Sequence, residues 1–260
     1  GAKVVVNDLG GEVDGSGGSS ESANNVVKEI TDSGGIAIPN GSSVTDDKGV
    51  KNMVDQAIDE FGRIDILINN AGILRDKSFS KMEIDDFTIV TDIHLMGSVK
   101  PTKMVWEIMK EQNYGRILVT TSSTGLYGNF GQTNYGAAKA GIAGFMRCLW
   151  LEGIKYGITV NVLAPTATSR LTTDILPEEI QENFPPEAVS PAVVWLCSDE
   201  AKDISGRQWL VAGNNVSLLS WQLTPIATRE LSEGFWGVDE IGEKIMESKE
   251  NWPPINPMRG

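Results

Sequence analysis

Three polar residues have types and spacing that suit proton transfer: Ser122, Tyr135 and Lys139. Tyr135 and Lys139 are four residues apart, so on a helix they share a face one turn apart. A phenol with a pKa near 10 is a poor acid or base at neutral pH, and lowering this pKa by about 3 units takes roughly 4 kcal/mol. An ammonium group about 4 Å away supplies an interaction of that order. The pattern predicts a tyrosine acid/base activated by the lysine, with Ser122 holding a carbonyl or alkoxide oxygen.

Two further motifs predict a nucleotide-binding site beside these residues. Alone, a tyrosine and a lysine at helical spacing are more often an accidental pair. Residues 69–72 (Asn-Asn-Ala-Gly), however, follow an apolar segment, where amides and a glycine suit a turn at the carboxyl end of a parallel strand. Asp8 ends the first predicted strand, where a carboxylate accepts hydrogen bonds from a ribose 2′-hydroxyl and repels a 2′-phosphate. We therefore predict a dinucleotide crevice that takes NAD.

The elements that must position these residues alternate along the chain. Short β-branched runs are followed by longer segments of helical period, which is typical of βαβ units on a parallel sheet. Strands are predicted at residues 4–7, 36–39, 64–69, 116–121, 158–164 and 208–212. Helices are predicted at residues 20–33, 46–61, 84–112 with a break at Pro101, 131–156 and 186–198. This order predicts an α/β fold, a Rossmann-like doubly wound parallel sheet with helices on both faces.

Composition and charge narrow the class of protein. The 260 residues are 40% hydrophobic and 22% charged, which fits one large globular domain. A net charge of −13 argues against wrapping the phosphate backbone of nucleic acid, and the absence of a long apolar run argues against a membrane span. Cys148, Cys197 and the single histidine, His94, lack metal-ligand spacing. We therefore expect no metal site and no disulfide, but two buried thiols.

The two ends of the chain carry separate expectations. Gly1 opens directly on an apolar strand, so we expect a segment to be missing before it. After residue 213 the apolar pattern weakens, and tryptophans are spread through a polar, acidic tail. We predict one domain over residues 1–215 and an extension over residues 216–260 that packs on the body or on a partner subunit.

The chain resembles the short-chain dehydrogenase/reductase family over about residues 1–215. The resemblance rests on residues 69–72, on Ser122 thirteen positions before Tyr135, and on Lys139 four positions after it. Within that family it is similar to the (3R)-hydroxyacyl-CoA dehydrogenase domains of peroxisomal multifunctional β-oxidation enzymes of type 2. Three longer strings carry this second likeness: VVNDLGG at residues 5–11, NAGILRDKSF at residues 70–79, and GLYGNFGQ at residues 125–132.

The resemblance implies roles for individual residues. Tyr135 would exchange a proton with the substrate oxygen, Ser122 would orient that oxygen, and Lys139 would lower the tyrosine pKa and hold the nicotinamide ribose. His94 occupies the position where many relatives have an asparagine in a proton relay. The residues that would contact NAD are Asp8, Val44, Asn70, Ala71, Gly72, Tyr135, Lys139 and Pro165.

Some positions depart from the family. The glycine fingerprint that cradles the pyrophosphate would lie before Gly1, in a missing strand, turn and helix of about 30 residues. The usual Pro-Gly is Pro165-Thr166 here, and residues 209–216 differ from the branch in a region that shapes the substrate end in relatives. Two alternatives to (3R)-hydroxyacyl-CoA oxidation therefore stay open: a reductase of a bulky ketone, and a non-catalytic scaffold of the same fold.

Relatives also suggest partners and a compartment. The resemblance implies an acyl-CoA substrate, a homodimer, and further domains in a longer polypeptide. Arg75, Lys77, Arg147 and Arg170 could supply positive potential for the polyanionic substrate. Relatives are peroxisomal, but the last residues, PMRG, are not a Ser-Lys-Leu type signal, so the cytoplasm is the alternative.

Overall fold

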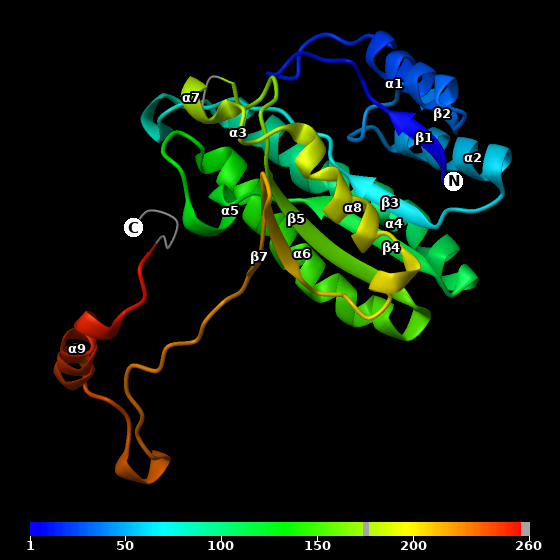
Figure 1. The fold of residues 1–260 in the computed structure, drawn as a ribbon. Coiled ribbons are helices and arrows are strands. Elements are labelled where there is room, and N and C mark those ends of the chain that lie inside the picture. Colours follow the sequence, from blue (N-terminus) through cyan, green and yellow to red (C-terminus); the bar gives the residue numbers. More distant parts are fainter. Residues whose placement is uncertain (174–176, 256–260) are drawn as a thin grey trace. The chain divides into compact units, whose positions relative to one another are not determined.

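Strands and helices alternate along the residues that this computed structural model describes, 1–173 and 177–255 (Figure 1). The chain divides into two compact units, Gly1–Leu219 and Ser220–Gly260. The first unit holds both sheets, and its alternation of strands with helices confirms the predicted α/β fold.

The larger sheet carries most of the predicted strands. Its order is β3 (Ile66–Asn69), β4 (Gly115–Thr120), β5 (Ile158–Thr166), β6 (Gln208–Ala212) and β7 (Asn215–Leu219). Strands β3 to β6 are parallel, and β7 runs antiparallel to β6. Strands β4 and β5 are buried almost throughout, because helices cover both faces of the sheet. Their near-continuous apolar sequences follow from that double coverage.

Two strands form a separate, smaller sheet. Strand β1 (Lys3–Asn7) pairs in parallel with β2 (Ile36–Asn40), and neither pairs with β3. On β3, Ile66 and Ile68 are 38% and 47% exposed, although parallel strands are normally buried. The predicted parallel sheet is therefore present in two parts, with β3 as an edge strand of the larger one.

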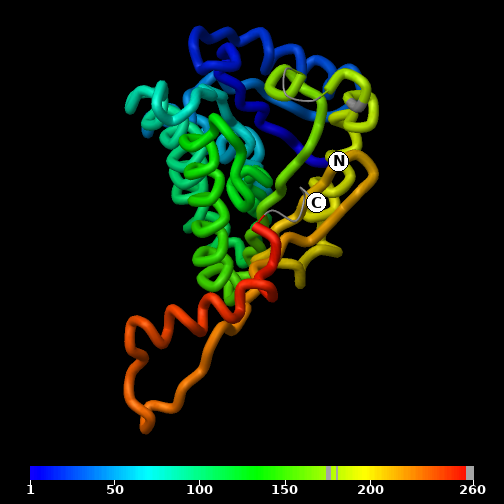
Figure 2. The backbone as a smooth tube through the Cα atoms, turned by 90° about the vertical axis from the view of Figure 1, so that its left-hand side faces the viewer, coloured from blue at the N-terminus to red at the C-terminus, as the bar shows by residue number. Residues whose placement is uncertain are grey.

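Helices surround both sheets of the first unit, and α1 (Glu21–Asp32) and α2 (Asp47–Phe61) pack on the smaller sheet. The others are α3 (Ile84–Thr91), α4 (Gly97–Gln112), α6 (Thr133–Gly153) and α8 (Ser190–Leu196), with short α5 (Thr124–Tyr127) and α7 (Glu178–Gln181). Figures 1 and 2 show α6 on one face of the sheet and α8 on the other. The main core lies under α4 and α6, where Met109, Ile142 and Met146 pack on Val119, Val160 and Val162.

The predicted break at Pro101 is wrong. Helix α4 continues through Pro101, and the irregular segment lies earlier, as a π turn over Asp92–Met96 between α3 and α4. Pro101 falls in the first turns of α4, where the loss of its N–H removes a single backbone hydrogen bond. The π turn carries His94, and such turns often occur at functional sites.

Strand β7 was not predicted. The two residues Gly213 and Asn214 connect β6 to β7 in a tight hairpin, with Gly213 at φ +53°. This turn, followed by alternating Val216 and Leu218, is the signal that the sequence offered. Strand β7 lies across the boundary predicted at residue 215, and what the tail packs on stays a prediction.

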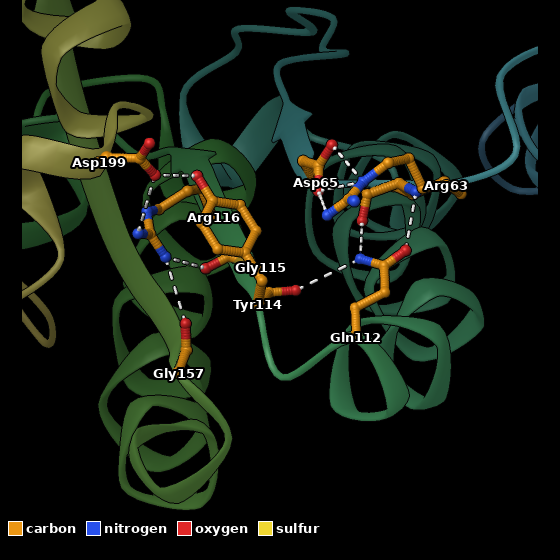
Figure 3. Close-up of polar contacts among 9 residues, drawn as sticks. Arg63, Asp65, Gln112, Tyr114, Gly115, Arg116, Gly157 and Asp199 are labelled. Atoms are coloured by element: carbon orange, nitrogen blue, oxygen red, sulfur yellow. Dashed lines mark hydrogen bonds and ion pairs between the residues drawn. The ribbon is translucent and has the colours of Figure 1, made fainter.

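Arg116 fixes the end of the sheet opposite the site (Figure 3). Its buried guanidinium donates to the carbonyls of Gly115 (2.9 Å) and Gly157 (3.2 Å) and lies 4.2 Å from the centre of the Tyr114 ring. Tyr114 in turn donates its hydroxyl to Asp199 at 2.8 Å. These contacts tie the start of β4 to the segment that follows α8, so the strand begins at a defined position.

The second unit is a short helical segment with its own contacts. Helix α9 (Val238–Glu247) is preceded by Arg229, whose guanidinium pairs with Glu240 and lies 3.9 Å from the centre of the Trp236 ring. Trp252 donates its indole N–H to Ser248 at 2.9 Å. Two of the tail's tryptophans therefore make specific contacts within this unit.

Candidate active site

The site forms where parallel strands of the larger sheet end. Asn70 follows β3, Ser122 follows β4, and Pro165 lies in the last residues of β5. Pairing between β4 and β5 stops at Leu163, so Pro165 needs no N–H on that side. Carboxyl ends of parallel strands are where α/β proteins bind ligands.

Helix α6 brings Tyr135 and Lys139 to Ser122, as their spacing predicted. The Ser122 hydroxyl lies close enough to Tyr135 to lower the pKa of the phenol. The Lys139 Nζ lies 5.5 Å from the centre of the Tyr135 ring and donates to the Thr120 carbonyl at 2.6 Å. Lys139 is only 3% exposed, and its own carbonyl accepts from Thr121 at 2.8 Å. The three side chains therefore converge at the end of β4, held by backbone contacts on both sides.

Burial controls the proton affinities of this group. It lowers the pKa of Lys139 to about 7. It also raises the pKa of Tyr135, a hydrogen bond with Ser122 acts in the opposite direction, and the charge of Asp76 raises it further. In this structure the pKa of Tyr135 is thus raised, whereas the sequence predicted a lowering by Lys139. The reason is that the phenolate would lose its hydration in a buried site.

His94 is buried against Tyr135. The two rings meet edge to face, with centroids 5.1 Å apart. Its Nε2 lies 2.8 Å from the Ile73 carbonyl and 3.2 Å from the Ile73 N–H. Burial and the charge of Lys139 lower the pKa of His94 to about 3, so the imidazole is neutral at physiological pH. Gly72 permits this contact, because a Cβ there would lie 2.4 Å from the His94 ring.

The predicted cofactor residues lie at strand ends or in the loops that follow. Asp8 is exposed beyond β1 and accepts from the Gly10 N–H at 2.6 Å through one carboxylate oxygen. Asn70 accepts from the Thr120 hydroxyl at 2.8 Å, and Ala71 beside it is exposed. Val44 packs on α4 at Gly97, where a Cβ would lie 2.6 Å from the valine side chain.

These residues fit the two ribose ends of a nicotinamide dinucleotide. The second carboxylate oxygen of Asp8 can accept from a ribose hydroxyl, and Asn70 and Ala71 are exposed at the end of β3. The described residues do not provide the usual site for the pyrophosphate. Within the described residues, no strand leads through a short glycine turn directly into a helix at the centre of the sheet.

Sequence reasoning missed two buried amides next to Tyr135. Gln132 donates to Asp76 at 2.6 Å, and Asn134 donates to the Arg75 carbonyl at 3.1 Å. Both side chains are almost completely buried. Their position one and three residues before Tyr135 was the available signal.

Two of the cations that were expected to attract the substrate form ion pairs with a carboxylate of this chain. Arg75 and Lys77 both pair with Asp86, at 3.3 Å and 2.6 Å, so their charge is partly neutralised.

Among the described residues, no cluster of three or more histidine, cysteine or acidic side chains could hold a metal ion, and no helix is long and apolar enough to cross a membrane. Cys197 is buried, but Cys148 is exposed on α6, so the expectation of two buried thiols is wrong for Cys148.

Known proteins are similar to this chain in sequence and in fold. The family model "short chain dehydrogenase" matches residues 6–182. The chain is 48% identical to a short-chain type dehydrogenase/reductase of Mycobacterium tuberculosis, over 83% of this chain and 75% of that protein. It is also 48% identical to the peroxisomal multifunctional enzyme type 2 of Mus musculus, over 86% of this chain and 30% of that protein. A crystal structure of a short chain dehydrogenase from Mycobacterium avium matches with a TM-score of 0.84 and 37% identity, over 98% of this chain and 88% of that one.

The chain therefore belongs to the short-chain dehydrogenase/reductase family, whose members are oxidoreductases that typically use NAD or NADP. It spans less than a third of the length of the mouse multifunctional relative.

Proposed function

We propose that this protein is an NAD-dependent dehydrogenase that interconverts a (3R)-hydroxyacyl-CoA and the 3-ketoacyl-CoA. The observation that carries the proposal is the convergence of Ser122, Tyr135 and Lys139 at the end of β4. The 48% identity to the peroxisomal multifunctional enzyme of the mouse supports the acyl-CoA substrate.

In the oxidation, the residues of this chain handle the proton. Ser122 holds the substrate oxygen by a hydrogen bond, and the Oη of Tyr135 accepts the hydroxyl proton. The acceptor for the hydride that leaves the carbon bearing this oxygen would be supplied by bound NAD. The Lys139 ammonium favours the phenolate form of Tyr135, and burial keeps water away from both groups. In the reverse direction, Tyr135 returns the proton to the ketone oxygen.

We assign the cofactor contacts on the same basis. Asp8 would accept from the adenosine ribose and disfavour the 2′-phosphate of NADP. Asn70, Ala71, Gly72 and Lys139 would face the nicotinamide half, with Pro165 and Val44 at its sides. A role for His94 is limited by its neutral state, so it would take part in a relay only as a hydrogen-bonding group.

Partners and compartment follow from the relatives. Because the mouse relative is a longer, peroxisomal enzyme, we propose that this chain is the dehydrogenase part of such a polypeptide, that it acts in the peroxisome and that it forms a homodimer. We retain residues 1–215 as the predicted cofactor-binding domain and the remainder as an extension.

Turnover with a panel of (3R)-hydroxyacyl-CoAs tests the proposal. We expect reduction of NAD in preference to NADP, and a loss of about 10²- to 10⁴-fold in kcat for Tyr135→Phe, the usual contribution of an acid/base group. Tyr156→Phe, in the short turn that follows α6, is the matched control and should retain activity. Absence of turnover together with tight NAD binding would favour the reductase of a bulky ketone, and absence of NAD binding would favour a scaffold.

A further inference from the structure

Gln132 is a buried residue near the catalytic residues, and its side chain makes three hydrogen bonds. It is 5% exposed, yet each of its amide atoms is used. Its Nε2 donates to the Asp76 carboxylate at 2.6 Å, and its Oε1 accepts from Thr124 at 3.1 Å and from Asn129 at 3.2 Å. A buried amide with all these bonds has one defined orientation. Asp76 is therefore held in place by the residue that precedes α6.

A second amide fixes the same segment from its other side. Asn134 is completely buried and donates to the carbonyls of Arg75 (3.1 Å) and Asp86 (3.4 Å). The Lys77 N–H also donates to the Gly131 carbonyl at 2.9 Å. The segment around Asp76 is thus bonded to the start of α6 through both side chains and backbone.

This arrangement connects Asp76 to the reacting groups. Gln132 is the residue before the first residue of α6, and Tyr135 is the third residue of that helix, so the two lie within one turn at its start. Thr124, which donates to Gln132, also donates its backbone N–H to the Ser122 hydroxyl at 3.2 Å. A chain of hydrogen bonds therefore runs from Asp76 through Gln132 and Thr124 to Ser122.

We propose that Asp76, held by Gln132, is a positioning residue whose negative charge favours the protonated form of the catalytic tyrosine. The inference rests on the proposed function, in which Tyr135 exchanges a proton with the substrate. The charge of Asp76 acts on Tyr135 from a distance, because Asp76 does not contact the substrate oxygen that Ser122 and Tyr135 hold. It restrains the formation of phenolate, and Lys139 opposes this effect only below its pKa of about 7, where the amine is charged.

The charges around Tyr135 agree with this role. Asp76 raises the pKa of Tyr135, whereas the hydrogen bond with Ser122 lowers it. Lys139 has a pKa of about 7 and His94 a pKa of about 3, so both are neutral in the alkaline range where a buried tyrosine titrates. A carboxyl is ionised in that range. The charge of Asp76 then acts on the tyrosine without a charged Lys139 to offset it.

The titration of Tyr135 tests the inference without any substrate. The chain has four tyrosines, so the Cζ resonance of Tyr135 in 13C-tyrosine-labelled protein is identified by its loss in Tyr135→Phe. In Asp76→Asn we expect the midpoint of its titration to fall by about one pH unit, because a nearby negative charge is removed. Asp85→Asn removes the same charge from the exposed start of α3 and should leave the midpoint unchanged.

A second variant guards against a folding defect. Gln132→Met releases the Asp76 carboxylate but keeps the charge, and should move the midpoint in the same direction by a smaller amount. An unchanged midpoint in Asp76→Asn, with the protein folded, overturns the inference. If the midpoint moves but no hydroxyacyl-CoA is oxidised by the unmodified chain, the proposed function fails and the inference on Asp76 stands. Where turnover occurs, the alkaline limb of the kcat/KM profile should move with the midpoint.

Discussion

His94 shows how one residue joins two parts of the site. Its ring lies on Gly72, bonds to Ile73 and contacts the edge of Tyr135, so the turn after β3 and the start of α6 are in contact through it. The ring remains neutral because a buried imidazolium near Lys139 would be unfavourable. His94 therefore positions Gly72, Ile73 and Tyr135 relative to one another.

The neutral His94 makes stability depend on pH. Its pKa is about 3 in the folded state and about 6.5 in an unfolded chain, so between these values the unfolded state binds the extra proton. We expect the free energy of unfolding to fall as pH decreases from 6.5 towards 3, by up to about 1.4 kcal/mol per pH unit from this group. Urea unfolding at pH 5 and pH 7 should show a smaller pH effect in His94→Asn, and equal effects in both proteins would contradict the assignment.

Helices α5 and α6 meet closely at Gly125. A Cβ at this position would lie 2.7 Å from the backbone of Lys139 and Ala140. Because backbone atoms cannot move aside as a flexible side chain can, the two helices require glycine there. The contact sets the distance between the segment that follows Ser122 and the part of α6 that carries Lys139.

Substitution of this glycine should separate the two helices. We expect Gly125→Ala to destabilise the protein by about 1–3 kcal/mol, the usual cost of overpacking, and to reduce turnover because Ser122 moves away from Tyr135. Gly144→Ala is the control in α6, where a Cβ meets nothing within 4 Å. It should stabilise the helix by about 0.5–1 kcal/mol, since alanine favours helix. Thermal unfolding and kcat measured on both variants separate these outcomes.

The larger and smaller sheets differ in how well they are protected. Strands β4 and β5 have neighbours on both sides and are buried, whereas among the described strands β1 and β2 pair only with each other, and most of their residues are partly or fully exposed. An isolated pair of strands depends on the helices that pack on it, here α1 and α2. The end of the protein that carries Asp8 should therefore open more readily than the end that carries Tyr135.

Hydrogen exchange measures this difference directly. We expect the amides of β1 and β2 to exchange about tenfold or more faster than those of β4 and β5, because local opening exposes fewer buried apolar groups. Addition of NAD should slow exchange in β1 if Asp8 binds the ribose. Uniform protection across both sheets, without NAD, would show that the smaller sheet is as stable as the larger one.

Local pattern was enough to predict much of this protein. The alternation of apolar runs with helical periods defines the α/β fold, and a spacing of four residues places Tyr135 and Lys139 on one helix face. These features depend on neighbouring residues alone, so the sequence by itself determines them. The tertiary structure decided the π turn at His94, the separation of the two sheets, and the bond between Asp76 and Gln132. Each joins residues distant in the chain or depends on burial, and burial also decided that the pKa of Tyr135 is raised.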